Sequence, residues 1–154
     1  MEKTFILQAI DISIGYSNKK ETTTVASEVS VSLEKGKLTA LIGANGIGKS
    51  TLLRTLIGIQ SPLFGKVLLE NKDIHSINNL TLAQHLSVVL TDKLPPSNLT
   101  VFELVALGRQ PYTNWIGKLT SEDIEKVKKA LELTQITHLA DKKHDEISDG
   151  QLQI

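Results

Sequence analysis

One short segment has the residue types and spacing of a phosphate-binding loop. Residues 43–50, "GANGIGKS", match the pattern G-x-x-x-x-G-K-[ST] at every specified position. Glycine at Gly43, Gly46 and Gly48 permits backbone torsions closed to other residues and leaves no Cβ atom to obstruct a phosphate. Successive backbone N–H groups can then point inward as an anion nest, and a helix that starts near Lys49 adds partial positive charge. The pattern therefore predicts a phosphate cradle.

The same pattern gives two side chains a role toward a nucleoside triphosphate such as ATP. Lys49 would reach the β and γ phosphates, and the Ser50 hydroxyl would bind the Mg²⁺ that bridges them. The predicted cofactor-binding residues of this segment are Gly43, Ala44, Asn45, Gly46, Ile47, Gly48, Lys49, Ser50 and Thr51. The competing interpretation is a glycine turn that only joins a strand to a helix. The sequence context favours the phosphate cradle, because the motif requires a buried strand before it and an amphipathic helix after it.

Five stretches have the composition and periodicity of strands. Residues 5–14 and 22–33 are rich in Val, Ile, Thr and Ser and alternate with a period near two, which predicts antiparallel strands. Residues 38–43 and 86–91 are almost wholly apolar, which is typical of strands buried on both faces of a parallel sheet. Residues 65–71 resemble a further strand. The glycine loop thus follows a predicted buried strand directly.

Helix signals follow the loop and dominate the second half of the chain. Apolar residues recur at helical spacing after the loop, and Gly58 marks the predicted end of that helix. Thr100 with Glu103, and Thr120 with Asp123, have the spacing of capping boxes that open two further helices.

These elements predict an α/β fold with a P-loop NTPase (RecA-like) core. Residues 1–94 would contain an antiparallel β subdomain and the P-loop core, and residues 95–154 an inserted α-helical subdomain. Because 154 residues cannot hold two ordinary domains, we expect one domain or part of a larger one.

The composition excludes several functional classes. The 17 basic and 17 acidic residues balance, and no basic cluster exists, so no nucleic-acid partner is expected. The chain has no cysteine, which fits a reducing compartment. The four histidines are too scattered to predict a metal site. No signal peptide or stretch of eighteen apolar residues is present, so a cytoplasmic location is expected.

A second motif near the end of the chain narrows the class of P-loop protein. The segment "ISDGQLQ", residues 147–153, resembles L-S-G-G-Q, the signature of ABC-type ATPases, and it follows the P-loop at the separation seen in that class. "ELVALGRQPY" and "LADKKHDEISDGQ" are similar to the ATPases that energise import of iron chelates (siderophores), haem and vitamin B12. The chain therefore resembles the nucleotide-binding domain of an ABC transporter over essentially its whole length.

This resemblance implies a shared site between two subunits. Two such ATPase subunits would form a homodimer around two ATP molecules, and Ser148, Gly150 and Gln151 would contact the nucleotide held by the partner's P-loop. Tyr16 lies where ABC ATPases place an aromatic ring that stacks on adenine, although a packing role is the plainer alternative. Opening and closing of the pair would drive a transmembrane permease, supplied indirectly by a substrate-binding protein. The ATPase would then be peripheral on the inner face of the cell membrane.

Two positions depart from the family pattern. The family has a glutamine after the strand predicted at residues 86–91, where it helps to hold Mg²⁺, but this chain has Thr91 followed by Asp92. We expect one of the two to substitute for it through a water molecule. Asp149 replaces the first glycine of the signature. Its carboxylate would repel a γ phosphate, so we expect it to point outward as a helix cap.

The family's catalytic residues have no counterpart in this sequence. ABC ATPases continue with the Walker B strand that ends in Asp, a catalytic Glu and a later His, whereas this sequence stops at Ile154. We therefore expect a partial nucleotide-binding domain, truncated before the Walker B strand, with weak or no ATP hydrolysis of its own. A nonhydrolysing nucleotide-binding module is one alternative. A P-loop small-molecule kinase is another, but its lid would need arginines, and beyond Pro95 only Arg109 is available. The sequence does not identify the transported solute.

Overall fold

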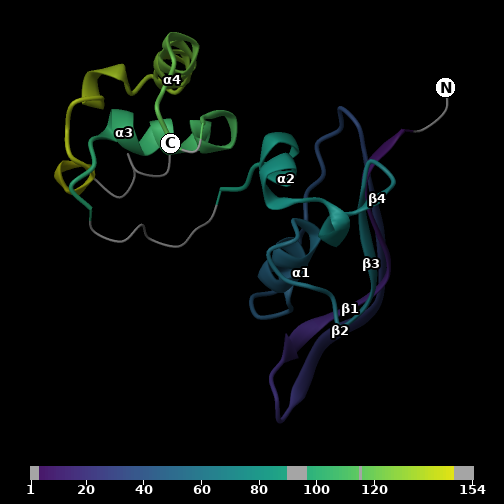
Figure 1. The fold of residues 1–154 in the computed structure, drawn as a ribbon. Helices are drawn as coiled ribbons and strands as arrows, with labels where there is room; N and C mark the ends of the chain where they lie inside the picture. Colours follow the sequence, from purple (N-terminus) through teal and green to yellow (C-terminus); the bar gives the residue numbers. More distant parts are fainter. Residues whose placement is uncertain (1–3, 90–96, 115, 148–154) are drawn as a thin grey trace. The chain divides into compact units, whose positions relative to one another are not determined.

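A computed structural model describes residues 4–89, 97–114 and 116–147 of the chain. The chain divides into two compact units, Met1–Leu86 and Ser87–Ile154 (Figure 1). Each unit has its own hydrophobic core. The boundary predicted between residues 94 and 95 lies outside the described residues.

An antiparallel sheet forms the framework of the first unit. Its strands are β1 (Phe5–Ser17), β2 (Thr22–Glu34), β3 (Phe64–Leu69) and β4 (Lys72–Asp73), in the order β2-β1-β3-β4. All three strand pairs are antiparallel. The prediction of an antiparallel β subdomain is confirmed.

A bulge in β1 keeps its apolar side chains on one face. Leu7 and Ala9 are buried, and two residues with the opposite parity, Ile12 and Ile14, are buried as well. One extra residue between them shifts the register against both neighbouring strands, and Asp11 takes a positive φ of 47° there. This single insertion reverses the alternation of a strand, so both halves of β1 face the same core.

Three short helical segments accompany this sheet: α1 (Lys49–Leu56), a 3₁₀ turn (Ile74–Ser76) and α2 (Asn79–His85). Leu56 of α1 packs into the core formed by β1 and β3. Gly58 ends α1 with a φ of 78°, which confirms the predicted stop.

The second unit is helical. Its described residues form α3 (Val101–Ala106), α4 (Ser121–Leu133) and three 3₁₀ segments, at Leu107–Tyr112, Thr137–Leu139 and His144–Glu146. Its core consists of Val101, Val127, Leu131, Ile136 and Leu139. Both predicted capping boxes form: the Thr100 side chain accepts from the Glu103 N–H and the Thr120 side chain from the Asp123 N–H, each at 3.2 Å. The predicted helical subdomain is thus confirmed in character.

The two predicted buried parallel strands are wrong for the described residues. Residues 38–43 and 86–89 have no regular secondary structure. Leu38 and Ile42 are 100% and 90% exposed. A strand buried on both faces forms only where neighbouring strands pair with it, and the four-stranded sheet described here provides no parallel partner. Leu90 and Thr91 lie outside the described residues.

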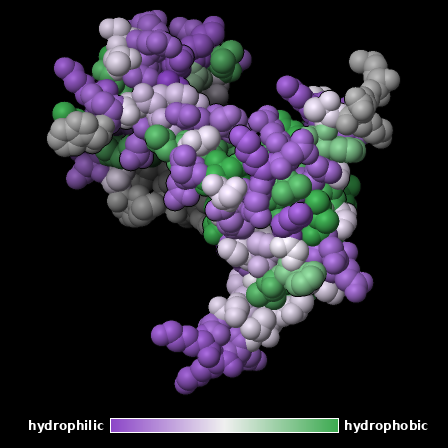
Figure 2. All heavy atoms as spheres, turned by 45° about the vertical axis from the view of Figure 1, so that its right-hand side comes forward, coloured by the Kyte–Doolittle hydropathy of each residue, from purple (hydrophilic) through white to green (hydrophobic). Residues whose placement is uncertain are grey.

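Hydrophilic side chains gather at one end of the first unit. The tip of the β1–β2 hairpin, at the bottom of Figure 2, is hydrophilic, and its residues 18–21 are all exposed.

Among the described residues, no helix has both the length and the apolar character needed to span a bilayer.

A partly buried ion pair joins two segments of the second unit. The Arg109 Nε donates to Asp123 Oδ1 at 3.0 Å, and the Arg109 guanidinium lies 4.0 Å from the centre of the Tyr112 ring. Asp123 Oδ2 accepts from the Thr120 N–H at 3.0 Å and from the Thr120 hydroxyl at 2.7 Å. These hydrogen bonds, followed by the charge of Arg109, lower the pKa of Asp123 from 3.8 to about 2.

We predict that this carboxylate makes the second unit acid-sensitive. Because the pKa of Asp123 is lower in the folded state, its stabilising effect is present above about pH 4 and is lost as the pH falls toward 2. Urea unfolding between pH 7 and pH 2 should show a smaller loss of stability in this window for Asp123→Asn than for the unmodified chain.

The matched control is Glu125→Gln on the exposed side of the same helix, where the carboxylate is 74% exposed. Its unfolding free energy should follow that of the unmodified chain. An Asp123→Asn variant with an unchanged pH profile would contradict the assignment.

Candidate functional site

The glycine loop turns sharply before α1. Gly46 and Gly48 have φ angles of 81° and 105°, a region that side-chain-bearing residues rarely adopt. Gly43 has no positive φ, so the expectation of a special torsion is wrong at this position. A Cβ atom on Gly43 would instead lie 3.3 Å from the Ile47 side chain, so its role here is close packing within the loop.

Gly48 also fits the loop closely against β2. A Cβ atom at this position would lie only 2.5 Å from Cγ1 of Val25. Because Gly48 is the N-cap of α1, this contact fixes where the helix begins relative to the sheet. The sequence motif predicts glycine at this position but does not reveal its partner.

The N-terminus of α1 differs from those of the other α-helices in the described residues. Asn78, Thr100 and Thr120 cap α2, α3 and α4 with side-chain oxygens. Gly48 provides no such cap, and the first turn of α1 contains no acidic residue. The first N–H groups of a helix lack partners within it, so those of α1 remain available to an anion, with the helix dipole in support.

Lys49 adds a full positive charge to this loop. Its ammonium group donates to the carbonyl oxygens of Gly43 and Ala44, each at 2.7 Å. The side chain therefore folds back over the loop instead of extending into solvent. This arrangement brings the predicted phosphate-binding lysine to the glycine-rich backbone, as the motif requires.

Two further predicted residues flank the loop. Ser50 is exposed in the first turn of α1, and its hydroxyl is an oxygen donor of the kind that Mg²⁺ prefers. Tyr16, at the end of β1, shares a hydrogen bond of 2.9 Å between its hydroxyl and that of Thr51. The structure thus brings Tyr16 to the P-loop helix across a long sequence separation, while its role toward adenine stays a prediction.

The remaining predicted site residues lie outside the described residues. These are Thr91 and Asp92 at the expected metal position, and Ser148, Asp149, Gly150 and Gln151 in the signature segment. Their predicted roles therefore stay predictions.

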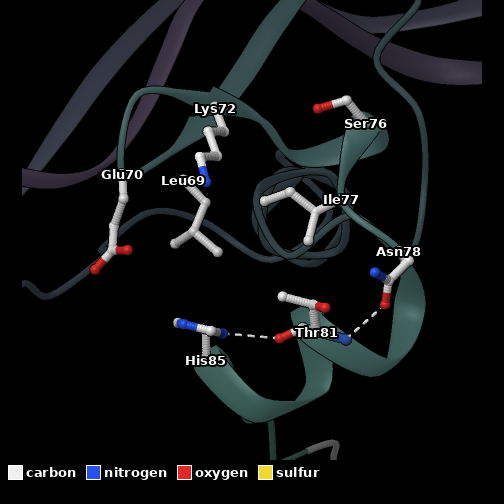
Figure 3. Close-up of a pocket in the computed structure, with 8 residues that line it drawn as sticks. All are labelled: Leu69, Glu70, Lys72, Ser76, Ile77, Asn78, Thr81 and His85. Atoms are coloured by element: carbon white, nitrogen blue, oxygen red, sulfur yellow. Dashed lines mark hydrogen bonds between the residues drawn. The ribbon is translucent and has the colours of Figure 1, made fainter.

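A pocket elsewhere in the first unit contains none of the predicted residues. It has a volume of about 260 Å³ and lies by the turn from β3 to β4, facing α2 (Figure 3). His85 lies at its edge, with Nδ1 2.8 Å from the Thr81 carbonyl oxygen. Its lining residues are Leu69, Glu70, Lys72, Ser76, Ile77, Asn78, Thr81 and His85. No sequence motif marks this pocket, because its residues come from the ends of β3 and β4, the 3₁₀ turn and α2 without a shared pattern.

The donor set of the loop fits a nucleoside triphosphate. Uncapped N–H groups and the Lys49 ammonium complement several phosphate charges, and the Ser50 hydroxyl suits a divalent cation beside them. A glycine loop that opens an uncapped helix, packed on a sheet, defines a P-loop nucleotide-binding protein.

Comparison with known proteins identifies the family. The model of the ABC transporter family matches residues 26–154, and the chain belongs to this family. It is 38% identical over 142 residues to the probable siderophore transport system ATP-binding protein of Bacillus subtilis, with 92% of this chain and 50% of that protein covered. It is 39% identical over 147 residues to the ferric enterobactin transport ATP-binding protein of Escherichia coli, with 96% and 53% covered.

The fold agrees with a solved structure of the family. An ATP-binding cassette of an ABC transporter in its ADP conformation matches with a TM-score of 0.74 and 32% identity, covering 96% of this chain and 61% of the other. The chain spans about half the length of the curated relatives that it matches. The predicted fold class and family resemblance are confirmed.

We predict that Gly48→Ala destabilises the first unit more than an ordinary glycine substitution. The new methyl group would meet Val25 at 2.5 Å in a backbone conformation with φ of 105°. Strain and overpacking together should lower the free energy of unfolding by about 2–4 kcal/mol. Urea denaturation followed by circular dichroism measures this change.

Gly36→Ala is the matched control. Its φ of 75° is also positive, but a Cβ atom there meets nothing within 4 Å. It should cost only about 1 kcal/mol. Equal losses in the two variants would show that the contact with Val25 is unimportant.

Proposed function

We propose that this chain is the ATP-binding part of an ABC transporter ATPase that couples ATP binding and hydrolysis to import of an iron chelate. The observation that supports nucleotide binding best is the uncapped N-terminus of α1 with the Lys49 ammonium folded over the same loop. The two curated relatives described above are named for siderophore and ferric enterobactin transport, which favours an iron-siderophore solute. Haem and cobalamin are the alternative solutes implied by the sequence resemblance.

In this proposal the P-loop residues divide the work on ATP·Mg²⁺. Backbone N–H groups from Gly43 to Thr51 bind the phosphates, and Lys49 neutralises charge on the β and γ groups. Ser50 binds Mg²⁺, with Thr91 as a second ligand through water. The Tyr16 ring stacks on adenine.

The proposed partners follow from the family resemblance. A second ATPase subunit contributes its signature segment, so Ser148, Gly150 and Gln151 of one chain contact the nucleotide on the other. The dimer drives transmembrane permease subunits at the inner face of the membrane, and a substrate-binding protein delivers the solute. We assign no residue of this chain as the catalytic base, so hydrolysis is proposed for the whole protein.

We predict that Lys49→Ala weakens ATP·Mg²⁺ binding at least tenfold. A hydrogen bond to a charged group contributes about 1.5–3 kcal/mol, which corresponds to roughly 10- to 150-fold in affinity. Isothermal titration calorimetry of the chain with ATP and Mg²⁺ measures the change. Lys35→Ala, at an exposed lysine in the β2 turn, is the charge-matched control and should bind as the unmodified chain does.

A Lys49→Ala chain with unchanged affinity would exclude the P-loop as the binding site. Binding that depends on Lys49 but not on Mg²⁺ would leave nucleotide binding intact and remove the proposed metal role of Ser50.

Transport tests the proposed solute separately. Cells that produce the whole protein with Lys49→Ala should accumulate less radiolabelled iron supplied as a ferric siderophore, because the ATPase binds the nucleotide that drives the permease more weakly. Uptake of an amino acid by the same cells should stay unchanged. Undiminished iron accumulation by a Lys49→Ala protein whose ATP binding is weakened in the titration would exclude the iron chelate as solute.

A further inference from the structure

The hydroxyl of Thr51 contacts Tyr16, a residue outside the phosphate loop. We infer that Thr51 is a positioning residue that holds the Tyr16 ring as a preformed support for the nucleotide base. The two hydroxyl oxygens lie 2.9 Å apart and share a hydrogen bond. The inference rests on the proposed function and deepens it, because it connects recognition of the base with the first turn of the P-loop helix.

The backbone before Tyr16 is fixed from two sides. A Cβ atom on Gly15 would lie 2.1 Å from the Thr23 carbonyl oxygen of β2 and 2.8 Å from the Leu63 side chain, so the chain passes closely between them. The side-chain amide of Gln60 donates to the Gly15 carbonyl oxygen. The Leu63 N–H donates to the Ser13 carbonyl oxygen at 2.7 Å. The end of β1 is therefore held by β2 and by the segment that follows α1.

The other end of the contact is equally well fixed. Thr51 is only 6% exposed and belongs to the first turn of α1. Its carbonyl oxygen accepts from the Thr55 hydroxyl at 2.9 Å, and Thr55 is fully buried. The Thr51 hydroxyl is thus a rigid anchor at the end of the helix where the phosphates are proposed to bind.

This anchor restricts the Tyr16 ring without covering it. Tyr16 is 53% exposed although its hydroxyl is engaged, so much of its surface stays available for stacking. A ring whose rotamer is set before binding loses less side-chain entropy when a base stacks on it. Such a planar surface beside a phosphate cradle suits a purine, because offset stacking of aromatic rings is favourable.

Tyr16→Phe is the decisive variant, because it keeps the ring and removes only the hydroxyl. Freeing the ring should weaken ATP binding about 2- to 10-fold, the range expected for the ordering of one side chain. Binding of inorganic tripolyphosphate, which has no base, should stay unchanged. Calorimetric titrations with both compounds, in the presence of Mg²⁺, separate the two effects.

The Thr51 side of the pair is tested by a double-mutant cycle. In a Thr51→Val background, Tyr16→Phe should weaken ATP binding no further, because the shared hydrogen bond is already absent. Thr51→Ser keeps a hydroxyl and should restore the dependence on the Tyr16 hydroxyl. Tyr112→Phe, at the other tyrosine of the chain, is the matched control and should bind ATP normally.

The outcomes distinguish this inference from the proposed function. If the unmodified chain binds neither ATP nor tripolyphosphate, the nucleotide-binding function itself fails. If it binds both, and Tyr16→Phe affects neither or weakens both equally, the positioning role of Thr51 is overturned while the phosphate site stands. Additive effects of Tyr16→Phe and Thr51→Val would also overturn it.

Discussion

The proposed phosphate site requires the first turn of α1 to expose its backbone N–H groups while the rest of the helix is held on a sheet. A side-chain cap would occupy those groups, so the helix starts at Gly48 without one. Glycine also allows the close approach to Val25 that seats the helix start against β2. The absence of a side chain at Gly48 thus has two effects: the first N–H groups of α1 have no side-chain cap, and the start of the helix can pack closely against β2.

Strand β1 contributes residues both to the hydrophobic core of the first unit and to the surroundings of the glycine loop. The bulge at Asp11 keeps Leu7 and Ile14 on the same buried face although their positions differ in parity. The strand can therefore run on to Tyr16 and deliver its ring to Thr51 without losing its packing. An uninterrupted alternation would have turned half of β1 away from the core. The bulge therefore allows β1 to pack into the core along its length and to reach the P-loop helix through Tyr16.

In the second unit, the described α-helices begin with side-chain caps. Both caps are threonine capping boxes, in which the Thr100 and Thr120 side chains accept from the N–H groups of Glu103 and Asp123, whereas α1 has no side-chain cap. Asp123 combines a cap with a partly buried ion pair to Arg109, and the two interactions satisfy both oxygens of this nearly inaccessible carboxylate. Among the described α-helices, the N-termini of α2, α3 and α4 are capped by their own chain, and the uncapped N-terminus of α1 is the one proposed to bind a ligand.

The sequence alone determined what depends on near neighbours: the P-loop at residues 43–50, the capping boxes, the antiparallel strands and the stop at Gly58. These signals are local, since each involves residues a few positions apart. The predicted buried strand at residues 38–43 was wrong. An apolar composition indicates that a strand can be buried, but it does not indicate whether partner strands are present to bury it. The tertiary structure alone decided that Val25 lies against Gly48 and that Thr51 contacts Tyr16. The residues of each pair are far apart in the sequence, and only the folded backbone brings them together.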